Sequence, residues 1–460
     1  MRGSDLRTTL KGQLLFRLEA AQVWSLLARA TQLVSGFVTL GLVAHFFDLS
    51  TQGYFFTFNS LIALQVFAEM GLSMVLIQFS AHEMAKLNWT EAGKVEGDKT
   101  AKARLRALLI FALGWFGVSG ILLVVILIPA GEWFFNRAVT VNILPANLLL
   151  HWNLLVFFVS GNLIVTAICN IIEGTGRVTE VAGVRFAQFI GGGFAAWIAI
   201  AQGVGLLALA LQYGVMLVIG ITYLLTYRRR FIWDLIRAKL PSHALAWRRE
   251  ILPFQWRIAV SWLSGYFVFQ YTTPLLFSTH GPEAAGRMGM TMQVFSAISS
   301  ICIIFVTARI PIFGRMVANR IQSELDILFR RSVVQSFAAL VAALMLAMIL
   351  LTIVHWHEFS ISTRLLPLGQ SWILALACIG SHSIYVQSVY LRTHKQEPFM
   401  KLSVINGVLM AGLSTWFIPQ AGTAGAVAVY TFVTLCISAP IGTWIYLKFR
   451  SKIVAVDSKI

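Results

Sequence analysis

Long apolar stretches alternate with short polar segments along the whole chain. A helix that crosses a bilayer needs about 20 mostly apolar residues, and the hydrophobic pattern predicts roughly twelve such helices. We expect them near residues 23–46, 54–78, 107–128, 148–171, 181–201, 204–226, 252–277, 287–310, 333–355, 366–391, 400–418 and 422–446. The composition agrees, because 58% of the residues are hydrophobic and only 12% are charged, which is not the balance of a soluble domain. The predicted fold class is an all-α integral membrane protein with about 12 transmembrane helices.

Basic residues are distributed unevenly between the predicted helices. Of the 36 Lys and Arg residues, 32 fall in segments that would share one side of the membrane with the N-terminus. The opposite segments hold Arg137, Arg287 and Arg364, and Arg29 lies inside the first predicted helix. By the positive-inside rule, both termini are predicted to be cytoplasmic. The net charge of +17 therefore mainly reflects orientation, and because it is dispersed over short loops, nucleic acid is not an expected partner.

Two pairs of similar segments indicate an internal repeat. The stretch FFDLSTQGYFFTF around Gly53 is similar to STHGPEAAGRMGMT around Gly286, 233 positions later. The turn AQGVGLLALAL with Gly203 likewise resembles QAGTAGAVAVY with Gly422. Six crossings return a chain to its starting side, so two six-helix halves would be parallel repeats. The predicted domains are an N-terminal six-helix bundle over 1–226, a basic cytoplasmic linker over 227–250 and a C-terminal six-helix bundle over 251–460.

The linker contains an amphipathic segment. Phe231, Ile232, Leu235 and Ile236 share one face of a helix, while the neighbouring positions are basic. A basic amphipathic helix of this kind is typical of segments that lie on a membrane surface and contact membrane lipids. A plain charged linker is the alternative.

Several short motifs resemble those of a known transporter family. They are HGPEAAGRMGM at 280–290, Glu69-Met70-Gly71-Leu72, the Gly176-Arg177 turn, and the paired GxG and GxxG turns. The chain in these respects resembles the Wzx-type polysaccharide (O-antigen) flippases of the multidrug/oligosaccharidyl-lipid/polysaccharide (MOP) exporter superfamily. The first half departs from the family pattern, since it has DLSTQG where the family commonly has a Gly-Pro-Glu turn.

The resemblance implies a fold, a function and a location. The fold would be that of the MATE/MOP exporters. The function would be a flippase that moves undecaprenyl-diphosphate-linked oligosaccharide from the cytoplasmic to the periplasmic leaflet by alternating access, for lipopolysaccharide and other surface polysaccharide biosynthesis. The location would be the bacterial inner membrane, beside a polysaccharide polymerase and a chain-length regulator.

Such a cargo needs cations for its phosphates within a water-accessible path. Arg29 is the leading candidate because it lies inside a predicted helix, and Glu69 is the acidic residue placed to pair with it. A purely structural ion pair, or an Arg29 side chain that reaches back to the interface, is the alternative. The other candidates lie at cytoplasmic helix ends, where most basic residues only set topology. They are Arg257 and Arg309 for substrate binding, and Arg177, Arg185 and Lys401 around the cytoplasmic entrance.

Other functions receive less support from the residues. A cation-coupled multidrug and toxin extrusion antiporter is the second choice, because it would need several buried carboxylates in the first half. A membrane glycan polymerase or ligase is third, because the longest opposite-side loop, 129–147, holds only Glu132 and Arg137 as charged residues. The cluster His355, His357 and Glu358 resembles metal-ligand spacing but has no further partner nearby in sequence. No phosphate-binding loop of the GxxxxGK[ST] type occurs. We therefore assign no catalytic residue, metal or cofactor, and do not expect an enzyme.

Overall fold

The chain is helical over nearly all the residues that the computed structural model describes, which are 24, 27, 30–32, 34–138, 145, 147–238, 252–319, 321–394 and 399–457. Within them, eight helices are long and apolar enough to cross a membrane. They are Lys99–Arg137, Leu148–Gly174, Val178–Ala201, Leu207–Thr226, Ile258–Val317, Gln322–Trp356, Leu368–Thr393 and Met400–Ser451. This confirms the predicted fold class of an all-α, multi-pass membrane protein.

Two of the eight runs are too long for a single crossing. Ile258–Val317 has 60 residues and Met400–Ser451 has 52, and at about 1.5 Å per residue either would far exceed a hydrocarbon layer of about 30 Å. Each contains a glycine with non-helical backbone, Gly281 (φ 83°, ψ 178°) and Gly422 (φ 56°, ψ −132°). Leu49–Glu69 and Leu72–Met84 form a bent pair that also qualifies as a span, and Ala30–Phe46 is a shorter apolar helix. The number twelve and the side of the termini stay predictions.

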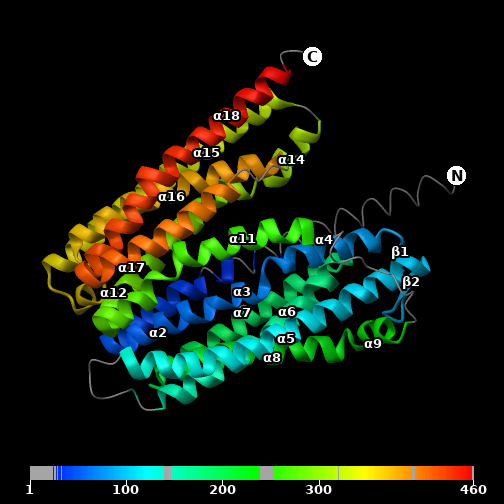
Figure 1. Cartoon of the computed structure of the whole chain (residues 1–460), viewed down its shortest axis with the longest axis horizontal. Helices are drawn as coiled ribbons and strands as arrows, with labels where there is room; N and C mark the ends of the chain where they lie inside the picture. Colours follow the sequence, from blue (N-terminus) through cyan, green and yellow to red (C-terminus); the bar gives the residue numbers. More distant parts are fainter. Residues whose placement is uncertain are drawn as a thin grey trace. The chain divides into compact units, whose positions relative to one another are not determined.

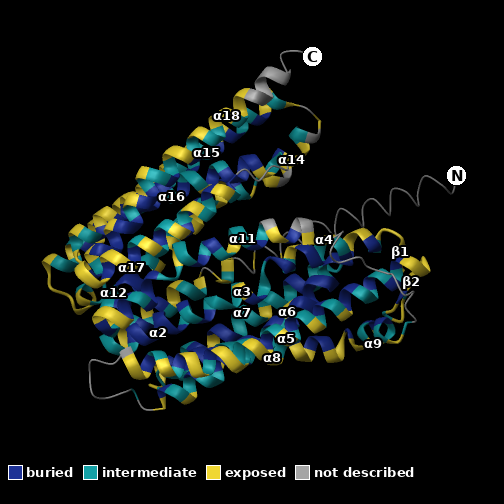
Figure 2. Cartoon of the chain, in the orientation of Figure 1, coloured by how far each residue is buried: buried dark blue, intermediate teal, exposed yellow. Residues whose placement is uncertain are grey.

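Exposed apolar faces support a position in lipid. Helix α5 (Lys99–Ala138) exposes Val118, Ile121, Leu122, Val125 and Ile126 by 50 to 65%. These positions follow the i, i+3, i+4, i+7, i+8 spacing of one helix face. Figure 2 shows exposed residues along the outer sides of the helices and buried ones between them. A continuous apolar face of this kind requires a non-aqueous surrounding.

The chain forms two compact units, of which the first contains residues 1–47, 64–136 and 143–259. It holds α3 (Val66–Glu69), α4 (Leu72–Met84), β1 (Leu87–Trp89), β2 (Val95–Gly97), α5, α6 (Leu148–Gly174), α7 (Val178–Ala201), α8 (Leu207–Thr226) and α9 (Arg229–Arg237). The long helices α5 to α8 run alongside one another (Figure 1), and α8 contacts both α6 and α7. The strands β1 and β2 pair antiparallel in a short hairpin. One hydrophobic cluster joins α4, the hairpin, α5, α6, α8 and α9.

The predicted amphipathic helix forms, but its apolar face covers protein. Phe231 and Leu235 are fully buried in the cluster of the first unit, and Ile232 and Ile236 pack against it. The sequence hypothesis placed this face against the membrane surface, and that part is wrong. The physical reason is that α9 starts only three residues after the end of α8, and the apolar side chains of α8, α5 and the hairpin offer a dry surface there.

The second unit contains residues 48–63, 137–142 and 260–460. It holds α2 (Leu49–Ile62), α12 (Thr272–Cys302), α13 (Ile304–Thr307), α14 (Ile310–Ala318), α15 (Gln322–Trp356), η2 (Ser360–Arg364), α16 (Leu368–Thr393), α17 (Met400–Thr431), the π-helix η3 (Phe432–Ser438) and α18 (Ala439–Asp457). The short helix η1 (Ala63–Gln65) follows α2, and α11 (Leu252–Phe269) leads into this unit. Helix α16 contacts α15, α17 and α18.

Helices α2 and α12 approach each other through glycines. A Cβ atom added to Gly286 would lie 2.9 Å from the backbone nitrogen of Gly53, and one added to Gly53 would overlap the backbone of Pro282. The fully buried Gln52 donates a hydrogen bond from Nε2 to the Gly286 carbonyl oxygen, at 3.1 Å. Small residues allow two helix backbones to come this close in a membrane. The two glycines matched by the sequence repeat are therefore in contact.

The same repeat also matches the starts of these helices. Asp48 caps α2 by accepting bonds from the backbone nitrogens of Ser50 and Thr51, at 3.2 and 3.3 Å. At the position 233 residues later, Gly281 interrupts α12 and Pro282 opens the next helical segment. A capping Asp and a Gly-Pro step both start a helix. The segment DLSTQG, which replaces the Gly-Pro-Glu turn of the family pattern in the first half, thus also starts a helix. Because α2 packs on α12, the compact units divide the chain differently from the predicted bundles.

Candidate functional site at the broken helix

The second predicted span is interrupted in its interior. Helix α3 ends at Glu69 and α4 begins at Leu72, and the two parts of the span are bent by 41°. Between them Met70 (φ 42°, ψ 36°) and Gly71 (φ 69°, ψ 9°) both adopt the left-handed conformation. Glycine does so freely, whereas this conformation is uncommon for a methionine. Discontinuous helices in transporters expose backbone groups that bind substrates and ions.

Side chains of neighbouring helices stabilise the break. In a continuous helix the carbonyl of Ala68 would accept the hydrogen bond of residue 72. Here it accepts one from the indole Nε1 of Trp115 on α5, at 2.9 Å. An added Cβ at Gly71 would overlap the side chain of Ile258 on α11, so this position also requires a glycine for space. The break is therefore a built feature of the first unit.

Glu69 lies at this break and is partly buried. Its carboxylate accepts a hydrogen bond from the hydroxyl of Ser73, in the first turn of α4. The N-terminal end of a helix carries partial positive charge, so the carboxylate of one half-helix is held at the favourable end of the other. A charged ligand that binds near Glu69 would change the electrostatic interactions of its carboxylate. Because that carboxylate is bonded to Ser73 on the other side of the break, the ligand would also act on the joint between α3 and α4.

The structure describes some of the predicted substrate-binding residues only in part. Arg29 lies outside the described residues, so the Arg29–Glu69 pair stays a prediction. Arg257 lies within α11, but its side chain is not among those described. Arg309 is the N-cap residue of α14, and its Nη1 donates a hydrogen bond to Ser332 Oγ on α15, at 2.6 Å. Lys401 lies exposed in the first turn of α17.

Both predicted entrance arginines of the first unit are ion-paired. Arg185 on α7 places Nη2 2.7 Å from Glu173 Oε2 and 2.8 Å from Asn170 Oδ1, both on α6. Arg177 places Nη1 3.1 Å from Glu180 Oε1. Both charges are thus balanced by protein carboxylates. The Arg185–Glu173 pair joins α7 to α6, whereas the Arg177–Glu180 pair lies within the first turn of α7.

Glu180 is the centre of a polar cluster that the sequence analysis missed. Its Oε2 accepts a hydrogen bond from the Tyr223 hydroxyl at 3.3 Å and pairs with Arg228. The guanidinium groups of Arg177 and Arg228 lie 4.8 and 5.1 Å from the ring centroid of Trp89. Burial lowers the pKa of Arg228, but its hydrogen bonds to Glu180 and Tyr223 outweigh this and raise the pKa above its ordinary value. This cluster joins the hairpin, α7, α8 and α9.

A buried polar chain in the second unit was likewise not predicted from the sequence. The Ser336 hydroxyl on α15 donates to the Cys302 carbonyl oxygen and lies 2.7 Å from His382 Nε2 on α16. His382 is only 2% exposed, and Ser332, one turn before Ser336, is fully buried. A histidine within the predicted helix 366–391 was the available signal, because ionisable residues inside membrane spans are rare.

No protein-family model matches the chain, and no curated protein matches it by sequence. Solved structures do. An inward-facing multidrug resistance MATE family transporter of the MOP superfamily superimposes with a TM-score of 0.61 at 14% identity, over 94% of this chain and 99% of the other. An outward-facing structure of a MATE family transporter gives 0.57 at 15% identity, over 96% of each chain. A MOP superfamily transporter from Pyrococcus furiosus gives 0.54 at 13% identity, over 96% of each chain.

These similarities extend over nearly the entire length of the proteins compared, at identities that show the fold alone. The chain has the fold of the MATE transporters of the MOP superfamily.

Proposed function

We propose that this protein is a membrane translocase that moves a lipid-linked oligosaccharide, carried on undecaprenyl diphosphate, from the cytoplasmic to the periplasmic leaflet of a bacterial inner membrane. The fold supports a transporter, since the similar structures are transporters in inward-facing and outward-facing conformations. The motif resemblance to Wzx-type flippases supports this cargo. The proposal includes a role in surface polysaccharide synthesis, beside a polymerase and a chain-length regulator.

One observation carries the choice of an anionic cargo. Among the described residues of the first unit, three carboxylates near the spans are ion-paired with arginines. The pairs are Glu83 with Arg104, Glu173 with Arg185, and Glu180 with both Arg177 and Arg228. A carboxylate that is neutralised in this way is a poor site for a coupling cation or a cationic drug, because the arginine competes for it. These ion pairs therefore favour an anionic, phosphate-bearing cargo over a cationic one.

The broken helix supplies a mechanism for alternating access. Glu69 is bonded to Ser73 across the joint, and Arg29 is our proposed second partner. A diphosphate that attracts Arg29 would leave the Glu69 carboxylate without its counter-charge, which changes the electrostatic balance at the joint between α3 and α4. Binding of the cargo would thereby be coupled to a change in the bend at Met70 and Gly71, since a ligand shifts a conformational equilibrium only by differential binding.

A cation-coupled multidrug antiporter is the second candidate. Two observations favour it. The fold likeness includes multidrug resistance transporters, and among the described residues Glu69 is hydrogen-bonded to the Ser73 hydroxyl. A carboxylate held in this way inside a span can bind a proton, a sodium ion or a cationic drug. However, the similar MOP superfamily transporter from Pyrococcus furiosus has a binding pocket of reverse polarity, which suggests a different function for that transporter. The fold thus accommodates more than one cargo charge.

The test uses purified protein in proteoliposomes that contain a fluorescent polyprenyl-diphosphate oligosaccharide. Flipping exposes the fluorophore to a membrane-impermeant quencher, and efflux of cationic dyes is measured on the same vesicles. We expect flipping by the unchanged protein without dye efflux. Glu69→Gln should slow flipping by about tenfold or more, which corresponds to ~1.4 kcal/mol on the barrier.

The variant is chosen to preserve the joint. The glutamine amide oxygen can still accept the Ser73 hydroxyl hydrogen, so the charge alone is removed. Glu91→Gln is the matched control, because Glu91 is an exposed carboxylate beside the hairpin. Dye efflux without flipping would transfer the assignment to the antiporter. Equal flipping by Glu69→Gln and Glu91→Gln would exclude the proposed role of Glu69.

A further inference from the structure

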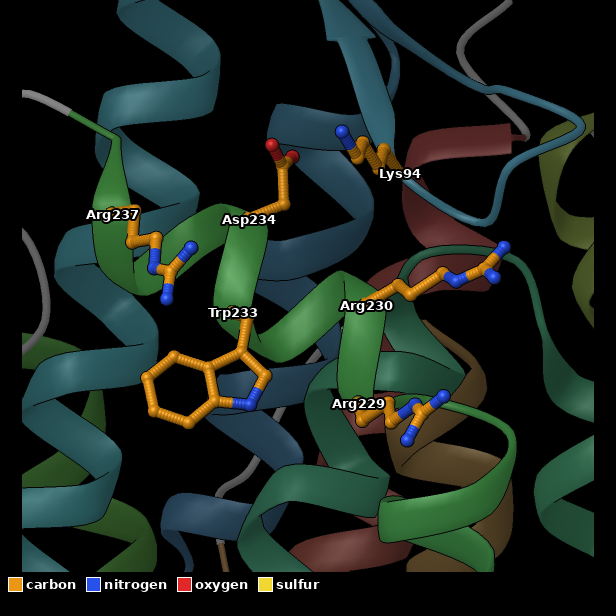
Figure 3. A pocket seen from close by; sticks show the side chains of 6 residues that line it. All are labelled: Lys94, Arg229, Arg230, Trp233, Asp234 and Arg237. Atoms are coloured by element: carbon orange, nitrogen blue, oxygen red, sulfur yellow. The ribbon is translucent and has the colours of Figure 1, made fainter.

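A cationic cavity lies beside α9 in the first unit. It has a volume of about 490 Å³ and is lined by Lys94, Arg229, Arg230, Trp233, Asp234 and Arg237. Figure 3 shows Arg229 and Arg230 extending from the first turn of α9, with Trp233 and Arg237 further along the helix and Lys94 from the hairpin. Its lining includes no residue of the broken helix or of the Glu180 cluster.

The charges of this cavity are unbalanced. Its one carboxylate, Asp234, pairs with Lys102 on α5 at 2.8 Å. Arg237 lies 5.2 Å over the ring of Trp233. Among the described residues, the exposed side chains of Lys94, Arg229 and Arg230 have no acidic partner. Neighbouring arginines repel one another, so an anion that joins them lowers the electrostatic energy.

The scaffold of the cavity is held firmly. Phe231 and Leu235 are fully buried between the cationic positions, and Arg228, which precedes α9, is fixed by Glu180. On the hairpin side, the backbone nitrogen of Lys94 donates to Thr90 Oγ1 at 3.1 Å. The basic side chains are therefore presented from fixed backbone positions, which reduces the entropy cost of binding.

The position of the cavity indicates the ligand. Helix α9 begins three residues after Thr226, the last residue of a membrane-spanning helix. The cavity thus lies at the depth of lipid headgroups, where an exposed tryptophan is favourable. Arginine donates paired hydrogen bonds to phosphate oxygens. We infer that this cavity binds the phosphate of a lipid headgroup through Lys94, Arg229, Arg230 and Arg237.

Two lipids offer this chemistry. One is an anionic phospholipid of the bilayer, such as phosphatidylglycerol. The other is the polyprenyl diphosphate of the cargo, and this second source rests on the proposed function. In either case the site would hold the phosphate at the end of α8, next to the membrane surface.

The experiment is native mass spectrometry of the full-length protein in neutral detergent, with phosphatidylglycerol, phosphatidylcholine or a polyprenyl diphosphate added. The variant is Arg229→Ala/Arg230→Ala, and the matched control is Arg330→Ala/Arg331→Ala, an exposed arginine pair on α15. We expect the first pair of substitutions to weaken binding of one anionic lipid by about tenfold, as for lost charge-assisted hydrogen bonds, and the control pair to leave it unchanged. Lys94→Ala should weaken it less.

The lipid whose binding is lost identifies the source. Loss of phosphatidylglycerol binding alone assigns a bilayer lipid, and this result stands even if the protein flips no oligosaccharide. Loss of polyprenyl diphosphate binding alone assigns the cargo. If both arginine pairs affect each anionic lipid equally, or if phosphatidylcholine binds as well as the anionic lipids, the inference is overturned. All four arginines are exposed, so thermal stability should be the same in both variants.

Discussion

The contact between α2 and α12 predicts a steep sensitivity to a single methyl group. In Gly53→Ala the new Cβ would lie 2.7 Å from Pro282 Cα and nearer still to the Pro282 carbonyl. Carbon atoms in ordinary contact are about 3.5–4.0 Å apart, so the two backbones must separate by roughly 1 Å. Because the obstacle is backbone, a side-chain rotation cannot relieve it.

The separation affects more than the methyl group. The bond from Gln52 Nε2 to the Gly286 carbonyl is already 3.1 Å long, and a shift of this size would break it. Overpacking usually costs about 1–3 kcal/mol, and a buried hydrogen bond contributes about 0.5–1.5 kcal/mol. Together we expect a loss of roughly 2–4 kcal/mol in the free energy of unfolding.

The assay is the apparent melting temperature in detergent, at one fixed scan rate because unfolding of such proteins is often irreversible. Gly53→Ala should melt on the order of 5 °C lower than the unchanged protein. Gly286→Ala, whose Cβ would lie 2.9 Å from Gly53 N, should be intermediate. Gly412→Ala is the control within the same unit, because no heavy atom lies within 4 Å of the added Cβ. Equal melting of Gly53→Ala and Gly412→Ala would refute the close approach of α2 and α12.

Two further substitutions test other parts of the first unit. Gly71→Ala should lower the free energy of unfolding by about 1–3 kcal/mol, because it adds backbone strain at φ 69° and overlap with Ile258. Adding Ile258→Ala should restore only the part of the stability that the overlap costs. A double variant no more stable in the melting assay than Gly71→Ala would contradict this. Arg228→Ala should cost about 1–3 kcal/mol, since it removes a partly buried partner of Glu180 and one cation over Trp89. In the same assay, the melting temperature of Arg228→Lys should lie between those of Arg228→Ala and the unchanged protein. An Arg228→Ala protein that melts like the unchanged one would show that the Glu180 cluster is not stabilising.

The helical breaks show where sequence reasoning succeeds. Gly281 and Gly422 fall at or beside predicted helix ends, because turn glycines and prolines are visible locally. The break at Met70 and Gly71 was not predicted, although the motif was noticed. Both flanking segments are apolar, and an apolar run carries no sign of a bend inside it. The bend depends on partners distant in sequence, Trp115 and Ile258.

The candidate cations illustrate the limit for functional sites. Arg177 and Arg185 were assigned to the entrance because they lie at a cytoplasmic helix end, and the structure gives each a carboxylate partner. The partner of Arg185, Glu173, lies on the preceding helix. Whether a charge is free depends on which carboxylate the fold places within about 4 Å of it. For Arg185 that distance is set by the packing of α6 against α7 and is not encoded in the spacing of the charges. The Arg177–Glu180 pair, three positions apart, is visible in the sequence once α7 is known to start there.

By itself, the sequence determined that the chain is an all-α, multi-pass membrane protein. The reason is that lipid imposes a long apolar helix for every crossing, and that requirement is written locally in the chain. Only the tertiary structure decided which glycines touch, which arginines are neutralised, that the apolar face of α9 is buried on protein, and that a span breaks beside Glu69. Apart from the local Arg177–Glu180 pair, these features depend on residues that are distant in sequence, and close packing brings them together.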